Sequence, residues 1–359
     1  MSTDDPFCLT SPEAARRAPR PAPTQPGDRD PFRVPGPAVV SFSGGRTSAY
    51  MLRRVLDAYG GKLPPDVHVV FANTGEEDVR TLDFVHRCAT EWGVRIVWVE
   101  YHDASPGRWR EVDYHTASRD GAPFAEMLDR KGHLPNGRMR FCTQELKLRP
   151  MRGFMAAQGY GDDWTNVVGL RWDEPARVST LRARDSAWDV VCPLYDARVS
   201  KADVLAWWKA QPFGLATPAY AGNCVGCFLK GRHLRDRAAR EAPEVWERWA
   251  HHERVAGARF IFGEPEGYAG QLRRVRALPV LPFDDEAEDT SLPCDCTQRR
   301  APPMRTCTCG ARRGQGHALT CSRVWGDHPG VYYAPAPGTD DAARVLHHHD
   351  HDHDHHEAL

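Results

Sequence analysis

The sequence predicts an α/β fold, a doubly wound parallel sheet followed by a mainly helical, cysteine-containing C-terminal extension. Two observations support this prediction. Between residues 38 and 99, three apolar runs of strand length alternate with two segments of helical periodicity, the pattern of a parallel sheet with helices on its faces. The first strand leads into the first helix through a glycine-rich turn, Ser43-Gly44-Gly45. Because such sheets bind ligands beyond the carboxyl ends of their strands, this turn marks the expected site.

The expected elements follow in order along the chain. Apolar runs predict strands at 38–42, 67–72, 94–99, 164–170 and 189–191, and helical spacing predicts helices at 50–56, 78–92, 144–158, 201–210 and 244–255. The polar stretch 103–137 is expected to form a long loop with one short helix at 123–130. Composition divides the chain into a disordered arm at 1–36, an α/β domain at 37–230, a helical extension at 231–283, a cysteine-rich segment at 284–330 and a disordered His- and Asp-rich tail at 331–359.

Composition and charge exclude several classes of protein. Of the 359 residues, 41% are hydrophobic and 26% charged, which excludes a wholly disordered chain. No apolar run is long enough for a transmembrane helix, and residues 1–31 lack the apolar segment of an export signal. We therefore expect a cytoplasmic protein with no membrane partner. The net charge of −1 favours no partner, but 41 of the 47 cationic side chains are arginines, whose forked donors suit phosphate and sulfate.

The strongest motif is the junction Ser41-Phe42-Ser43-Gly44-Gly45-Arg46-Thr47-Ser48. A glycine-rich turn at a helix N-terminus directs backbone N–H groups at an anion, so this turn predicts a phosphate-binding loop. It is not a Walker loop, because the Gly-Lys-Ser/Thr ending is missing. The alternative is an ordinary strand–helix turn with a serine or threonine cap.

Four motifs in this order resemble those of the PP-loop ATP pyrophosphatases and phosphoadenosine phosphosulfate reductases. They are Ser43 to Ser48, Phe71 to Glu76 with Thr81-Leu82, Arg140-Phe141-Cys142-Thr143 with Lys147, and Gly169 to Glu174 with Arg177. The resemblance runs from Ala38 to about Lys230. It implies a HUP/Rossmann-like domain at 37–230 that binds an adenine nucleotide, either ATP or an adenylyl sulfate (APS or PAPS).

The resemblance also implies roles for individual residues. Phosphate would be cradled by Ser43, Gly44, Gly45, Arg46, Thr47 and Ser48. The nucleotide would lie beside Asn73, Thr74 and Gly75, and the catalytic cations would be Lys147, Arg171 and Arg177. The chain departs from the family at Thr47, where ATP-cleaving members usually carry Asp.

Eleven cysteines in a chain without an export signal favour reduced thiols, metal ligands or catalysis over disulfides. The pair in Cys224-Val-Gly-Cys227 can grip one metal, and Cys142 and Cys192 would complete a set of four. A cysteine near the lysine motif with a later Cys-x-x-Cys resembles the [4Fe–4S] arrangement of the adenylyl-sulfate reductase and DNA-phosphorothioation branches. Zinc is the alternative. Cys88, on the apolar face of a helix, is expected in the core.

The end of the chain carries a second group of cysteines. A zinc-stabilised appendage and a disordered tail are equally compatible with Cys294, Cys296, Cys307, Cys309 and Cys321. Sulfonucleotide reductases have their nucleophile in a C-terminal Glu-Cys-Gly-Leu/Ile-His motif, of which Cys309-Gly310 keeps only two residues. Cys309 is therefore a candidate nucleophile. The His/Asp run at 347–356 offers ligands for zinc, nickel or copper.

Three functions follow in order of preference. The first is ATP-dependent thiolation, in which a substrate oxygen is adenylated and sulfur from a sulfur or thiol donor displaces AMP. The second is reduction of APS or PAPS with release of sulfite, which the altered tail motif disfavours. The third is a non-catalytic Fe–S protein that binds nucleotide or nucleic acid, tRNA or DNA, for which the helix around Trp246, Arg248 and Trp249 is a candidate surface.

Overall fold

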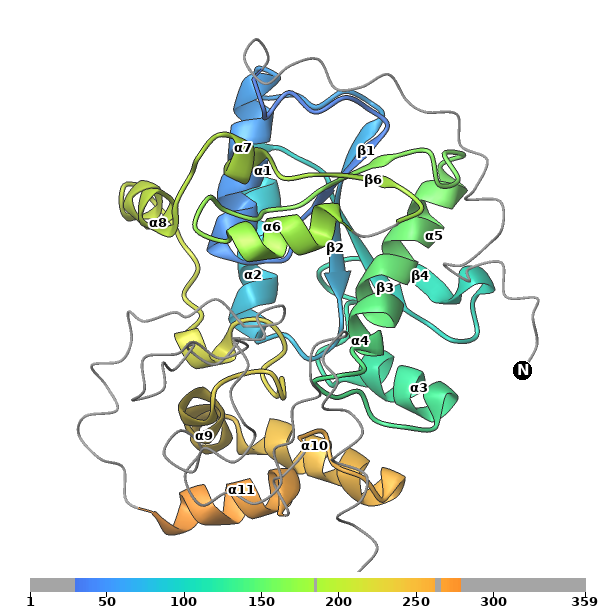
Figure 1. The fold of residues 1–359 in the computed structure, drawn as a ribbon, viewed down its shortest axis with the longest axis vertical. Helices are drawn as coiled ribbons and strands as arrows, with labels where there is room; N and C mark the ends of the chain where they lie inside the picture. Colours follow the sequence, from blue (N-terminus) through green and yellow to red (C-terminus); the bar gives the residue numbers. More distant parts are fainter. Residues whose placement is uncertain (1–29, 184–185, 262–265, 279–359) are drawn as a thin grey trace, which may run out of the picture. The chain divides into compact units, whose positions relative to one another are not determined.

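The computed structural model describes residues 30–183, 186–261 and 266–278 (Figure 1). The predicted segments 284–330 and 331–359, with Cys309 and the other C-terminal cysteines, lie outside the described residues, as does most of the predicted arm at 1–36.

Six strands form one sheet in the order β4-β3-β2-β1-β5-β6. All neighbours are parallel except β3 and β4, which are antiparallel. The strands are β1 (Ala38–Ser41), β2 (Val67–Asn73), β3 (Ile96–Tyr101), β4 (Trp109–Val112), β5 (Thr165–Val167) and β6 (Asp189–Val191). In register, Ala38 of β1 lies opposite both Val67 and Thr165. The chain therefore builds the sheet outward from β1 in both directions, which confirms the doubly wound α/β fold and places its topological switch point between β1 and β5.

Helices cover both faces of this sheet. Ala38 and Val40 of β1 pack with α1 (Arg46–Ala58), α2 (Val79–Trp92) and α8 (Lys201–Lys209). Val39, which faces the opposite side, packs with α5 (Arg149–Ala157). This alternation is the period of two expected of a strand that is buried on both faces. Figure 1 shows α1 and α2 on one side of the strands and α5 on the other.

The remaining helices connect these layers or follow them. They are α3 (Ala122–Lys131), α4 (Phe141–Thr143), α6 (Pro175–Arg182), α7 (Pro193–Asp196), α9 (Arg232–Glu241), α10 (Pro243–Ala256) and α11 (Gly267–Ala277), with the short turns η2 (Pro106–Arg108), η3 (Gln144–Leu148, a π-helix) and η4 (Ala219–Ala221). None of the helices in the described ranges has both the length and the apolarity needed to span a bilayer.

One local expectation needs correction. The stretch 103–137 contains a strand as well as a helix, because β4 pairs with β3 at the sheet edge. Its four residues are mostly half-buried and show no alternation, so periodicity could not reveal it. The helix predicted at 144–158 is divided: η3 covers its first five residues, and α5 begins at Arg149 with Pro150 in its first turn, where no N–H is needed.

The helical extension has its own aromatic core. Trp246, Trp249, Phe260 and Tyr268 are each at most 1% exposed and pack with side chains of the α/β part such as Phe124. The extension and the sheet domain thus share one hydrophobic cluster, and the domain boundary at residue 230 stays a prediction.

Candidate functional site

The turn between β1 and α1 has the geometry of an anion-binding loop. Gly44 has a φ of +74°, the left-handed conformation that favours glycine, and a Cβ there would lie 2.6 Å from Cγ2 of Thr81. Gly45 is the N-cap of α1, and no side chain of the described residues caps this helix end. A helix start without a side-chain cap, next to a glycine turn, offers N–H groups and positive potential to a phosphate. The turn fits the predicted role, and phosphate binding stays a prediction.

The two serines of the loop hold its shape. The Ser48 hydroxyl donates to the Gly45 carbonyl at 3.0 Å and accepts from the Ser43 N–H at 3.2 Å, and the two serine hydroxyls lie 3.0 Å apart. The segment that follows β5 lies close to this loop, since a Cβ on Gly169 would lie 3.5 Å from Cα of Ser48. The first and fourth predicted motifs therefore meet.

Arg46 is directed away from this cradle. Its Nη2 donates to the Leu215 carbonyl at 2.6 Å, and its own carbonyl accepts from the Trp208 indole at 2.8 Å. Arg46 thus fastens α1 to the segment around α8, and its predicted contact with phosphate stays a prediction.

Two predicted cations lie together beside the loop. Arg171 is 8% exposed, and its Nη1 donates to Oγ1 of Thr47 at 3.1 Å. Its Nε donates to Asp173 at 3.0 Å, and its Nη2 lies 3.3 Å from Glu174. The buried Glu174 also pairs with Arg177. An anion at this loop would therefore meet guanidinium groups already held in place by carboxylates.

The residues at the end of β2 are buried and bonded within the protein. Asn73 is 0% exposed and its Nδ2 donates to Glu100 at 2.6 Å. The Thr74 N–H and hydroxyl both donate to Glu77, at 2.9 and 2.8 Å. Gly75, with a φ of +76°, donates its N–H to Asn73 Oδ1 at 3.3 Å. These contacts stabilise the turn after β2, and a contact with nucleotide stays a prediction.

Three of the four predicted ligand cysteines gather around Lys147. Burial raises the pKa of Cys142 to about 11 and holds the pKa of Cys224 well above its usual value. The neighbouring Cys227 raises the pKa of both thiols further, and the Lys147 ammonium lowers both. Cys142 also packs against the hydrophobic cluster that contains Leu146 and Val225, so its segment and the turn of Cys224 and Cys227 lie in one region.

Cys192 is not part of this group. It follows β6, is 0% exposed and packs with Leu170 and Val178. Burial raises its pKa to about 11, and the charges with the largest effect on that pKa are those of Arg182, which lowers it, and Asp196, which raises it. The four-cysteine set expected from the sequence is therefore not assembled in this structure, because β6 lies at the far edge of the sheet, beyond β5. Cys88, also 0% exposed, lies in the core as expected.

The loop that carries Cys224 and Cys227 is held from several sides. The Val225 N–H donates to the Glu76 carbonyl at 2.8 Å. The buried Lys230 ammonium donates to the Val225 carbonyl at 2.9 Å, and the Tyr268 hydroxyl donates to the Gly226 carbonyl at 2.5 Å. Sequence reasoning missed these supports, which come from β2, the loop itself and α11.

An ion pair between the buried Glu76 and the half-buried Arg248 joins the same region to α10. The Glu76 carboxylate accepts from Arg248 at 3.0 and 3.1 Å and from the Trp249 indole at 2.9 Å. Burial raises the pKa of Glu76 although Arg248 opposes the shift. Trp246 and Trp249 are buried as well, so both tryptophans serve the core, and contact of this helix with nucleic acid stays a prediction. A carboxylate directly after β2 was the one signal for Glu76, and no signal pointed to a partner 172 residues later.

The three thiols have the chemistry to bind a metal ion or an iron–sulfur cluster, although they do not surround a common centre in this structure. Among the described residues, no three His, Cys, Asp or Glu side chains are arranged to hold a metal ion as they stand. Cys224 and Cys227 share a tight turn, since the Cys227 N–H donates to the Cys224 carbonyl at 3.1 Å. Binding of a metal or cluster would have to displace thiol protons, which the Lys147 charge favours.

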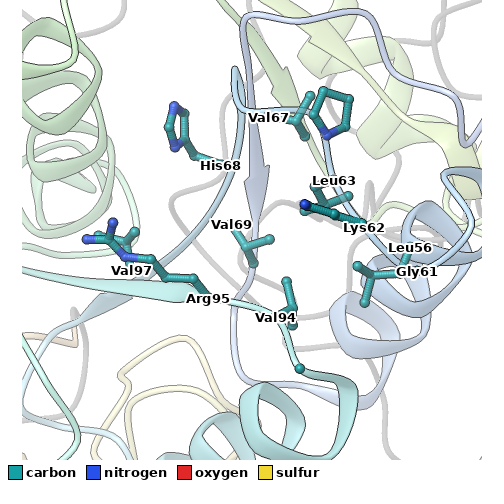
Figure 2. Close-up of a pocket in the computed structure, with 12 residues that line it drawn as sticks. Leu56, Gly61, Lys62, Leu63, Val67, His68, Val69, Val94, Arg95 and Val97 are labelled. Atoms are coloured by element: carbon teal, nitrogen blue, oxygen red, sulfur yellow. The ribbon is translucent and has the colours of Figure 1, made fainter.

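A cavity of about 230 Å³ lies elsewhere. Its lining includes Val67, His68 and Val69 of β2 and Val94 and Arg95 next to β3 (Figure 2). These residues lie at the amino ends of the strands, whereas the phosphate loop and the thiols lie beyond the carboxyl ends. The cavity therefore does not belong to the candidate site.

Comparison with known proteins finds relatives without an assigned function. No family model matches the chain. The uncharacterized nin region protein ORF290 of Escherichia phage lambda is 36% identical over 203 residues, which are 54% of this chain and 66% of that protein. The uncharacterized protein MJ0066 of Methanocaldococcus jannaschii is 24% identical over 248 residues, 65% of this chain and 44% of its own. The chain thus spans just under two thirds of the first relative and under half of the second.

Solved structures are also similar, and one of them matches at a low level. It is the U34-tRNA thiolase NcsA from Methanococcus maripaludis with its [4Fe-4S] cluster, 12% identical, with 68% of this chain and 73% of that chain covered and a TM-score of 0.30. A score this low supports no conclusion about function.

Proposed function

We propose that the protein is an ATP-dependent thiolation enzyme. The proposal rests on one observation: the predicted phosphate loop and the cysteine loop lie at the same edge of the sheet. The glycine turn follows β1, and Thr74, which follows the neighbouring β2, lies 3.4 Å from the Cys224 sulfur. A nucleotide phosphate and a sulfur-handling group would therefore be close enough to act on one substrate.

The phosphate loop would bind and activate ATP. N–H groups at the start of α1 face the phosphates, and Arg171, held beside Thr47, would stabilise negative charge as it develops on the phosphates. A substrate oxygen attacks the α-phosphorus, pyrophosphate leaves, and the substrate becomes an adenylate. Sulfur supplied at the oxidation level of sulfide then displaces AMP and leaves the thiolated product.

The three thiols would hold the cofactor that handles this sulfur. Cys142, Cys224 and Cys227 fit a [4Fe–4S] cluster in which one iron has no protein thiolate, and they also fit a zinc ion with one further ligand. A bound cluster supplies iron sites able to carry sulfur. Lys147 favours the thiolate form of the ligands, and the bonds from Lys230 and Tyr268 fix the loop.

Metal analysis after anaerobic purification tests the cofactor. We expect about four irons and four sulfides per chain, lost in each of Cys142→Ala, Cys224→Ala and Cys227→Ala. Cys192→Ala and Cys88→Ala, which replace buried thiols outside the group, are the matched controls and should keep the iron. Zinc without iron would exclude the cluster, and loss of iron in Cys192→Ala alone would exclude the three-thiol assignment.

Calorimetric titration with ATP tests the nucleotide site. We expect binding that Arg171→Gln weakens about tenfold or more, whereas Arg95→Gln, an exposed arginine at the amino ends of the strands, should bind as the native chain does. Absence of ATP binding by the native protein would overturn the proposed function.

A further inference from the structure

An aromatic pair lies exposed next to the phosphate loop. Trp172 is 46% exposed, an unusual state for the largest side chain. Its ring centroid lies 5.0 Å from that of the half-buried Tyr195, at an angle of 39°. The sequence places Trp172 directly after Arg171, whose Nη1 bonds to Thr47 of the loop.

One guanidinium group lies over each ring. Arg198 lies over Trp172 and Arg182 over Tyr195, each 5.5 Å from the ring centroid. Arg182 is neutralised by Asp196 at 2.7 Å. Within the part of the chain that the structure describes, no carboxylate pairs with Arg198, so this cation is available to an anionic partner.

The backbone holds the pair in place. The Trp172 N–H donates to the Val199 carbonyl at 2.8 Å, which fixes the two segments to each other. Arg198 has a φ of +56°, a left-handed conformation that side chains rarely adopt. This residue ends α7, where the Arg198 N–H donates to the Tyr195 carbonyl at 3.0 Å and the Val199 N–H donates to the Leu194 carbonyl at 2.8 Å, so the helix end fixes the backbone of Arg198.

We propose that Trp172 and Tyr195 form a stacking platform for an unpaired nucleobase of a nucleic-acid strand, with Arg198 in contact with a neighbouring phosphate. Aromatic rings beside arginines are the usual means of holding single-stranded nucleic acid, since every base has a face to stack and every linkage a charge. The inference rests on the proposed function in one respect: it names a nucleic acid as the class of acceptor that reaches the phosphate loop.

Binding of fluorescent oligonucleotides to the full chain tests the platform without ATP or turnover. Single-stranded RNA, single-stranded DNA, a duplex and AMP would be titrated at several salt concentrations. We expect the native chain to bind a single strand more tightly than the duplex. The comparison of single-stranded RNA with single-stranded DNA shows which of the two nucleic acids the protein prefers. Trp172→Ala should weaken this binding about tenfold and leave its dependence on salt unchanged, whereas Trp172→Phe keeps a ring and should recover most of the affinity.

Substitution of Arg198 should change the salt dependence of binding. Arg198→Asn, with a residue that tolerates left-handed backbone, should lower the slope of log affinity against log salt by about 0.7, and Arg198→Lys should keep it. Arg95→Ala is the matched surface control and should change neither quantity.

Three outcomes would overturn the inference. They are no binding of a single strand at low salt, equal affinity of Trp172→Ala and the native chain, and weakening by Trp172→Ala of AMP binding alone. Because the assay uses neither ATP nor a bound metal, its failure is distinguishable from a failure of the proposed function, which the iron and ATP measurements report separately.

Discussion

The hydroxyl of Thr74 lies 3.4 Å from the sulfur of Cys224, two residues 150 positions apart in the chain. The same hydroxyl donates to Glu77 at 2.8 Å, so one small side chain joins the end of β2 to the cysteine loop. The side chain of Thr74 therefore couples the position of the cysteine loop to the end of β2.

Replacement of Thr74 tests this dependence. Thr74→Val keeps the shape but leaves the Glu77 carboxylate with one bond fewer, which should lower the free energy of unfolding by about 2 kcal/mol. Thr74→Ser keeps the hydroxyl and should cost about 1 kcal/mol through the lost methyl. Urea denaturation measures both. An unchanged free energy of unfolding in Thr74→Val would mean that the hydroxyl contributes nothing.

The two loop glycines should respond differently to alanine. Gly44→Ala forces a left-handed alanine against Thr81 and should destabilise the fold by about 2 kcal/mol or more. At Gly45 a Cβ would lie 3.7 Å from the nearest atom, the Ser43 hydroxyl oxygen, so Gly45→Ala should cost less than about 1 kcal/mol. Thermal denaturation of the two variants is the measurement. A stable Gly44→Ala protein would contradict the loop geometry.

The pair of the buried Glu76 and the half-buried Arg248 should be among the costliest contacts to break. Glu76→Gln leaves the guanidinium without its countercharge and should lower the free energy of unfolding by about 3 kcal/mol. Glu111→Gln, which removes the carboxylate from an exposed pair with Arg95, should cost less than about 1 kcal/mol. Denaturant titration measures the free energy of unfolding of both variants. Similar losses would show that the pair of Glu76 and Arg248 contributes no more to stability than the exposed pair does.

The raised pKa of Cys142 predicts slow alkylation. Its thiol stays protonated below about pH 11, whereas a thiol in the unfolded chain ionises near pH 8.5 to 9. At pH 8 the metal-free protein should therefore react with iodoacetamide at Cys142 roughly 100-fold more slowly than the unfolded chain. The rate should keep rising between pH 9 and 11, after that of the unfolded chain has levelled off. Peptide mass spectrometry measures both, and equal rates at pH 8 would contradict the shift.

The sequence predicted the features that depend on local periodicity and on the rules of parallel sheets. The apolar runs that begin at Ala38 and Val67 became β1 and β2 because a strand buried on both faces needs nothing else. Arg171 reached Thr47 because both residues follow the carboxyl ends of adjacent parallel strands.

The features that sequence reasoning missed depend on strand order and on distant contacts. Cys192 was assigned to the thiol group by residue type and spacing, but spacing does not show that β6 is the outermost strand. The bond of Arg248 to Glu76 spans 172 residues and has no local signature. Trp172 was noticed only as part of a motif, because the exposure of a side chain is a property of the fold.

The support of the cysteine loop by α11 has a consequence for how the protein is made. Tyr268, whose hydroxyl holds the Gly226 carbonyl, is synthesised long after Cys142, and Arg248 emerges from the ribosome between Cys227 and Tyr268. The nascent chain can fold its sheet before this brace exists. The contact of Tyr268 with the cysteine loop can form only when α11 has been released, so this support is added late, after most of the chain has been translated.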